Sequence, residues 1–199
     1  MARLKLTSAE LTKIIETLEP EFAACVKRYD AGKYPLDAYS ALRLAFASPT
    51  KPNGGDIRRA LEWKYGHWVK ANYPKAHREV AVQIKRRWST FRRSDAETKF
   101  NYWTTSLKGA YITVTFLIHL LRPREFPIVD QHTFRAMNYL LAGVRSGRSA
   151  KKKPSTFDDL KTYAEFFRDL QTFWARRDAT IDRSKLDRGL MGYGQRLAR

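Results

Sequence analysis

Apolar side chains recur every three or four residues through most of this chain, and this spacing constrains its fold more than any other feature. The longest stripe runs over five turns and consists of Phe157, Leu160, Tyr163, Phe167, Leu170, Phe173 and Trp174. Similar stripes in residues 11–18, 36–47, 57–69 and 75–91 are typical of amphipathic helices. No segment alternates apolar and polar residues, and no internal repeat is visible. The sequence therefore predicts an all-α fold with about eight to ten helices.

Polar residues at capping positions precede several of these stripes. In a capping box, the side chain before the helix accepts from a backbone N–H three residues on, and an acidic side chain there reaches back. We expect helix starts at Thr7 with Glu10, at Asp56, at Ser94 with Glu97, and at Ser155 with Asp158.

The charge balance indicates an anionic partner. Lys and Arg number 38 against 20 acidic residues, which gives a net charge of +18 and a pI near 10.2. This excess is typical of nucleic-acid-binding proteins, although ribosome-associated and membrane-surface proteins share it. With 199 residues, 43% of them hydrophobic, the chain can bury one core or two small lobes packed on each other.

The single cysteine, Cys25, excludes an intramolecular disulfide, a thiolate zinc site and a four-cysteine iron–sulfur cluster. Its apolar neighbours favour a buried structural thiol over a nucleophile. The N-terminus lacks the apolar region of a signal peptide, and no apolar run approaches the roughly eighteen residues of a membrane helix. We expect a cytoplasmic monomer, nucleoid-associated if bacterial, that uses no cofactor, metal or membrane.

Residues 126–135 (FPIVDQHTFR) place one carboxylate where an apolar run gives way to a helix. Upstream, the apolar residues 111–121 are followed by Pro123, which forces a turn because proline lacks an N–H donor and fixes φ. Downstream, Phe134, Met137, Leu140 and Leu141 recur at helical spacing. Asp130 is therefore predicted at the N-cap or first turn of a new helix, where backbone N–H groups and the helix dipole favour its charge.

Two segments resemble the core of the helix-hairpin-helix DNA glycosylase superfamily, which includes endonuclease III, the adenine glycosylases and the 8-oxoguanine glycosylases. Residues 129–135 (VDQHTFR) match the Val-Asp-x-His-x-x-Arg motif of that family closely. Residues 107–113 (LKGAYIT) match its hairpin in degenerate form: Gly109 fits the first glycine, while Tyr111 replaces the second. The resemblance implies two helical lobes around a DNA-binding cleft.

In that family the motif carboxylate stabilises a sugar with oxocarbenium character, and the resemblance assigns this role to Asp130 with His132 as its companion. For Asp130 the competing interpretation is a plain helix cap, and for His132 a packed or capping histidine. The position of the lyase lysine falls on Ile112 or Thr113, so the resemblance implies a monofunctional enzyme without β-lyase activity. Lys108 is the one nearby amine.

Two segments are candidates for binding the DNA backbone. The hairpin residues Lys108, Gly109, Ala110 and Tyr111 would present N–H groups to a phosphate, although an ordinary turn between helices has the same sequence features. A basic loop in residues 143–154 carries five cations that suit flanking phosphates but are equally compatible with simple solvation: Arg145, Arg148, Lys151, Lys152 and Lys153.

A base-flipping enzyme also needs a pocket that stacks the extruded base. Candidates are the aromatic residues and histidine that crowd two short segments, namely Trp63, Tyr65, His67, Trp68, Tyr102 and Trp103. Each of these aromatic side chains is also an ordinary candidate for the core.

Together these features predict one glycosylase-like unit over residues 1–199, with the hairpin and catalytic segment in 106–141 and C-terminal helices in 155–199. The expected activity is excision of a damaged or modified base from double-stranded DNA, in repair or in defence. Alternatives are a DNA-binding protein that kept this fold without its chemistry, and an RNA- or single-strand-binding protein that stacks bases on aromatic residues.

Overall fold

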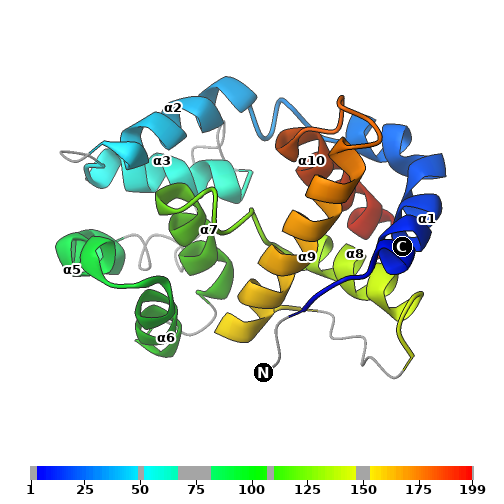
Figure 1. The fold of residues 1–199 in the computed structure, drawn as a ribbon. Coiled ribbons are helices and arrows are strands. Elements are labelled where there is room, and N and C mark those ends of the chain that lie inside the picture. The colour runs from blue at the N-terminus through cyan, green and yellow to red at the C-terminus, as the bar shows by residue number, and fades with distance from the viewer. Residues whose placement is uncertain (1–3, 49–51, 67–81, 107–109, 147–152, 199) are drawn as a thin grey trace. The chain divides into compact units, whose positions relative to one another are not determined.

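The computed structural model describes residues 4–48, 52–66, 82–106, 110–146 and 153–198. These residues form helices and contain no strand, which confirms the all-α prediction. The chain divides into two compact units, whose helices are labelled in Figure 1: unit 1 comprises Met1–Tyr29 and Phe126–Arg199, and unit 2 comprises Asp30–Glu125.

Unit 1 contains α1 (Ser8–Lys27), α8 (Gln131–Ala142), α9 (Phe157–Ala175) and α10 (Arg183–Arg196). Unit 2 contains α2 (Leu36–Ala47), α3 (Gly54–Lys64), α5 (Trp88–Arg93), α6 (Ala96–Ser106) and α7 (Tyr111–Leu121).

In unit 1, α10 packs against both α1 and α8. Two of its glycines allow this close approach. A Cβ on Gly192 would stand 2.2 Å from the carbonyl oxygen of Cys25 on α1, and one on Gly194 would stand 1.9 Å from that of His132 on α8. Both distances are far below van der Waals contact, so a residue without a side chain is required at each position. Cys25 is buried, as its apolar neighbours predict.

In unit 2, α7 is central, and α2, α3 and α6 pack against it. Its sequence is apolar around the whole circumference, and all residues from 113 to 120 are buried. Phe116 stacks on Trp63 of α3 with ring centroids 5.4 Å apart. The buried His119 lies with Nε2 2.6 Å from the hydroxyl oxygen of Tyr39 on α2.

Two of the predicted helix starts are confirmed. Thr7 and Glu10 form a complete capping box at α1, and Asp130 is the N-cap of α8. The other three helices start one to three residues from the predicted cap. The cap of α3 is Asn53 rather than Asp56, and the cap of α6 is Asp95 rather than Ser94. The cap of α9 is Thr156 rather than Ser155. Several adjacent side chains can cap a helix, and the packed register selects one of them.

Two predicted helices differ from their apolar pattern within the described residues. The helix predicted over 57–69 ends at Lys64, because Gly66 adopts a φ of 64° and its N–H donates to the Trp63 carbonyl. A left-handed glycine after the last turn is a common helix terminator. The helix predicted over 75–91 is interrupted at Arg87, after which α5 begins. The remainder of these patterns, residues 67–69 and 75–81, lies outside the described part of the chain.

Candidate functional site

Asp130 is held at the start of α8 by a reciprocal set of hydrogen bonds. Its backbone is extended, and its Oδ1 accepts from the N–H of His132 at 2.8 Å and from that of Thr133 at 3.0 Å. In return, the Thr133 hydroxyl oxygen accepts from the Asp130 N–H at 3.0 Å. One carboxylate oxygen is thereby fixed relative to the helix axis, and the dipole of α8 favours its negative charge.

The interior beside this cap contains a fully buried tyrosine. Tyr163, from α9, is 0% exposed, and Thr133 is also buried. The Tyr163 hydroxyl is enclosed and directed toward the Thr133 hydroxyl, in a geometry short of a regular hydrogen bond. Burial raises the pKa of Tyr163 well above its usual value, and the carboxylates of Asp187 and Asp130 add to the effect. The phenol therefore remains neutral at physiological pH.

His132 and Arg135 connect α8 to α10. Arg135 Nη1 donates to the Gly194 carbonyl at 2.9 Å and lies 3.3 Å from His132 Nδ1. Because a guanidinium can only donate, Nδ1 of this histidine is the acceptor in this contact. Arg135 thus holds the imidazole, two residues after Asp130, and ties the first turn of α8 to α10.

Thr133, Tyr163 and Asp187 were not predicted as site residues. Thr133 had a local signal, because Asp130 and Thr133 have the spacing of a capping box. Tyr163 belongs to the apolar stripe of α9, where its hydroxyl gives no pattern. Asp187 reaches the region only because α10 packs against α8, and no local pattern predicts that contact.

The hairpin prediction falls partly outside the described residues, because Lys108 and Gly109 lie in the undescribed segment. Ala110 is buried as the residue before α7, and Tyr111 packs edge-on against Phe100 with ring centroids 5.2 Å apart. Thr113, one of the two positions that correspond to the lyase lysine, is buried, and its hydroxyl lies 2.5 Å from that of Tyr65.

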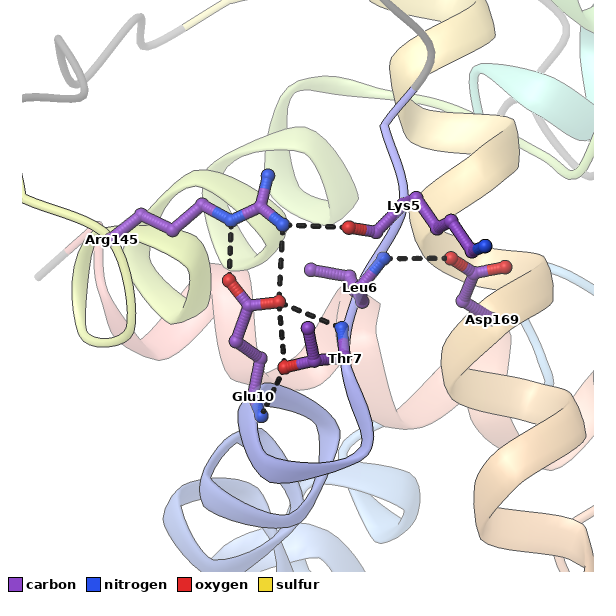
Figure 2. Close-up of polar contacts among 6 residues, drawn as sticks. All are labelled: Lys5, Leu6, Thr7, Glu10, Arg145 and Asp169. Carbon is purple, nitrogen blue, oxygen red and sulfur yellow. Dashed lines mark hydrogen bonds and ion pairs between the residues drawn. The ribbon is translucent and has the colours of Figure 1, made fainter.

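In the basic loop, Arg145 is engaged within unit 1. Figure 2 shows its guanidinium between Glu10 and the Lys5 carbonyl: Nε lies 2.6 Å from Glu10 Oε1, and Nη2 donates to the Lys5 oxygen at 2.7 Å. The hydrogen bond from Arg145 and the bond from the Thr7 backbone lower the pKa of Glu10 to about 2. This ion pair neutralises the Arg145 charge and argues against the predicted phosphate contact for this residue.

The other cations of that loop divide between exposed and undescribed residues. Lys153 is exposed, whereas Arg148, Lys151 and Lys152 lie outside the described residues. Their assignment to DNA phosphates stays a prediction.

The predicted base-pocket residues divide into three groups. Trp63 and Trp103 are 5% and 3% exposed and belong to the core of unit 2, where the Trp63 indole donates to the Pro35 carbonyl at 2.9 Å. Both indoles are thus core side chains in this structure, and their assignment to a pocket stays a prediction. Tyr65 is partly buried, and Tyr102 is 41% exposed with the Arg87 guanidinium 5.8 Å from its ring centroid. His67 and Trp68 lie outside the described residues.

Within the described ranges, no three His, Cys, Asp or Glu side chains are grouped closely enough to hold a metal ion. None of the helices in that part of the chain combines the length and apolar character needed to cross a membrane.

The candidate site is thus the start of α8, where Asp130, Thr133 and His132 are held by α8 itself and Tyr163, Asp187 and Gly194 approach from α9 and α10. Its link to DNA glycosylases is the sequence of residues 129–135. No protein-family model, curated protein or solved structure matches the chain.

Proposed function

We propose that this protein is a monofunctional DNA glycosylase that removes a damaged or modified base, with Asp130 as the catalytic carboxylate. The observation that carries the proposal is the fixed position of Asp130 Oδ1 at the N-terminus of α8, bonded to two backbone N–H groups, within a sequence that resembles the glycosylase motif. A carboxylate held in this way needs little reorganisation when positive charge develops nearby.

The chemistry follows from the bond that is broken. As the N-glycosidic bond lengthens, positive charge accumulates on the sugar, and an adjacent carboxylate stabilises this charge and orients a water molecule for attack at the anomeric carbon. Neither Ile112 nor Thr113 offers an amine for a covalent Schiff base, and the Thr113 hydroxyl is paired with Tyr65. The proposed product is therefore an intact abasic site.

The net charge of +18 supports DNA as the partner. A surplus of this size favours a polyanion through the release of counterions, and such binding weakens as salt rises. Affinity for the duplex should therefore depend steeply on ionic strength, whatever base the enzyme removes.

Asp130→Asn tests the proposal. Asparagine caps a helix as well as aspartate does, so folding and DNA affinity should be retained while the negative charge is lost. Release of the base should fall by about a hundredfold or more. The assay uses duplexes carrying uracil, 8-oxoguanine, alkylated or hypermodified bases, followed by alkali to cleave the abasic strand. Asp182→Asn is the matched control, because Asp182 caps α10 with its side chain exposed.

A DNA-binding protein of this kind without catalysis is the competing function, and the capping box favours it, because these hydrogen bonds alone would justify an aspartate at position 130. Undiminished base release by Asp130→Asn would place the chemistry elsewhere. Salt-dependent DNA binding without release of any base, in the parent protein, would identify the non-catalytic function instead.

A further inference from the structure

Helix α10 brings a second carboxylate to the start of α8. Asp187 lies seven residues before Gly194, which is two helical turns, so both residues share one face of α10. That face packs on α8, because Gly194 is in backbone contact with His132. Asp187 Oδ1 is enclosed within the protein. Asp187 is therefore directed toward the same interior that lies behind Asp130.

The buried hydroxyl of Tyr163 reports on both carboxylates. Tyr163 is 0% exposed and its hydroxyl is directed toward Thr133, which bonds Asp130. Asp187 and Asp130 both act electrostatically on this one hydroxyl and raise its pKa. The phenol of α9 therefore links the two carboxylates electrostatically, in a unit where α8 packs against both α9 and α10.

We propose that Asp187 is a supporting carboxylate of the Asp130 site, which adds a second fixed negative charge to the field that stabilises the cationic sugar. The inference rests on the proposed function and extends it to a residue outside the motif. Like charges that act on one site repel each other, and this repulsion is relieved when positive charge develops at that site. The relief is specific to the transition state, so it accelerates the reaction without tightening the binding of the neutral substrate.

Arg183 provides an opposing charge in the same region. It lies four residues before Asp187 on α10, with its guanidinium 5.3 Å from the centroid of the Phe167 ring, and it acts on Tyr163 in the sense opposite to Asp187. If the field of the site matters, removal of Arg183 and removal of Asp187 must have effects of opposite sign. A purely structural role for these residues predicts no such reversal.

The test compares two duplexes that contain uncleavable abasic analogues. One analogue is a pyrrolidine whose protonated amine stands at the anomeric position, and the other is the neutral tetrahydrofuran. The ratio of their dissociation constants measures the preference for a cation. The contribution of contacts to the rest of the DNA is the same for both duplexes and cancels in this ratio. At an effective dielectric constant near 20, a unit charge roughly 10 Å away changes such an equilibrium about tenfold.

Asp187→Asn should reduce the preference for the pyrrolidine about tenfold, and Asp130→Asn should reduce it further. Asp187→Glu should restore most of the preference, since it returns the charge, and Arg183→Gln should increase it. The matched control Asp182→Asn, the exposed cap of the same helix, should leave the ratio unchanged. If Asp187→Asn does not fold, Arg183→Gln still decides the matter.

The outcomes separate the two proposals. A parent protein that prefers the pyrrolidine, loses this preference in Asp130→Asn and keeps it in Asp187→Asn overturns the role of Asp187 and leaves the proposed function intact. An Arg183→Gln protein with an unchanged ratio overturns the role of Asp187 in the same way. A parent protein that neither prefers the cation nor releases a base contradicts the proposed function, and the role of Asp187 with it.

Discussion

Gly194→Ala should loosen the packing that carries the candidate site. The added Cβ would stand 1.9 Å from the His132 carbonyl oxygen, against 3.4 Å or more in ordinary contacts, so α10 and the start of α8 must separate by about 1.5 Å. Both groups are backbone, and neither can swing aside as a side chain could. The substitution therefore shifts a helix against the residue that follows Asp130 and Gln131.

This clash lowers the free energy of unfolding. Overpacking of a core typically costs about 1–3 kcal/mol, and a backbone clash belongs at the upper end. Alanine recovers about 1 kcal/mol through its higher helix propensity, which leaves a net loss of about 2 kcal/mol in the free energy of unfolding. For a unit of roughly 100 residues, this corresponds to a fall in Tm of about 10 °C.

Thermal unfolding followed by circular dichroism measures this loss, and two further variants isolate its cause. Gly192→Ala creates a similar clash with Cys25 on α1 and should be equally destabilised. Gly143→Ala is the control, because Gly143 has a φ of −68° and a Cβ there meets nothing closer than 3.4 Å. Below the melting temperatures, base release should fall further in Gly194→Ala than in Gly192→Ala, because only the former displaces α8. A Gly194→Ala protein that melts with the parent would refute the close approach of α10 to α8.

Two further predictions concern charge. Lys99 is 3% exposed, and burial lowers its pKa to about 8, so between pH 8 and the ordinary value of 10.5 the unfolded chain binds a proton that the folded chain does not. The free energy of unfolding should therefore rise across that window by up to about 3 kcal/mol. Urea unfolding at a series of pH values measures this rise, and Lys99→Met should remove it. The ion pair of Arg145 with Glu10, whose pKa is about 2 against 4.5 when unfolded, contributes stability that is present above pH 4.5 and lost as pH falls toward 2. Arg145→Gln should lower the unfolding free energy at pH 7 by about 1 kcal/mol and remove most of this acid sensitivity. The slope of log DNA affinity against log salt should stay unchanged in this variant. A shallower slope would show that Arg145 does contact a phosphate.

The sequence determined the helical class and most helix positions, because apolar spacing reports directly which face of a helix can be buried. It also determined the cap at Asp130, since an aspartate between a proline-terminated apolar run and a helical stripe has few other local roles. Where several capping residues are adjacent, as at Ser94 and Asp95 or at Ser155 and Thr156, the sequence predicted a helix start but not its residue. The choice depends on the register in which the helix packs.

Tertiary structure decided the surroundings of Asp130. Tyr163 looks like any apolar member of the α9 stripe, and Asp187 looks like a surface residue between Leu186 and Arg188. Their approach to the start of α8 depends on the contact of Gly194 with His132, which joins residues far apart in the chain. The roles of Trp63 and Arg145 likewise follow from partners on distant helices. Local sequence patterns show which residues one helix needs at its ends and on its buried face. A site assembled from three helices depends instead on which of their faces pack together.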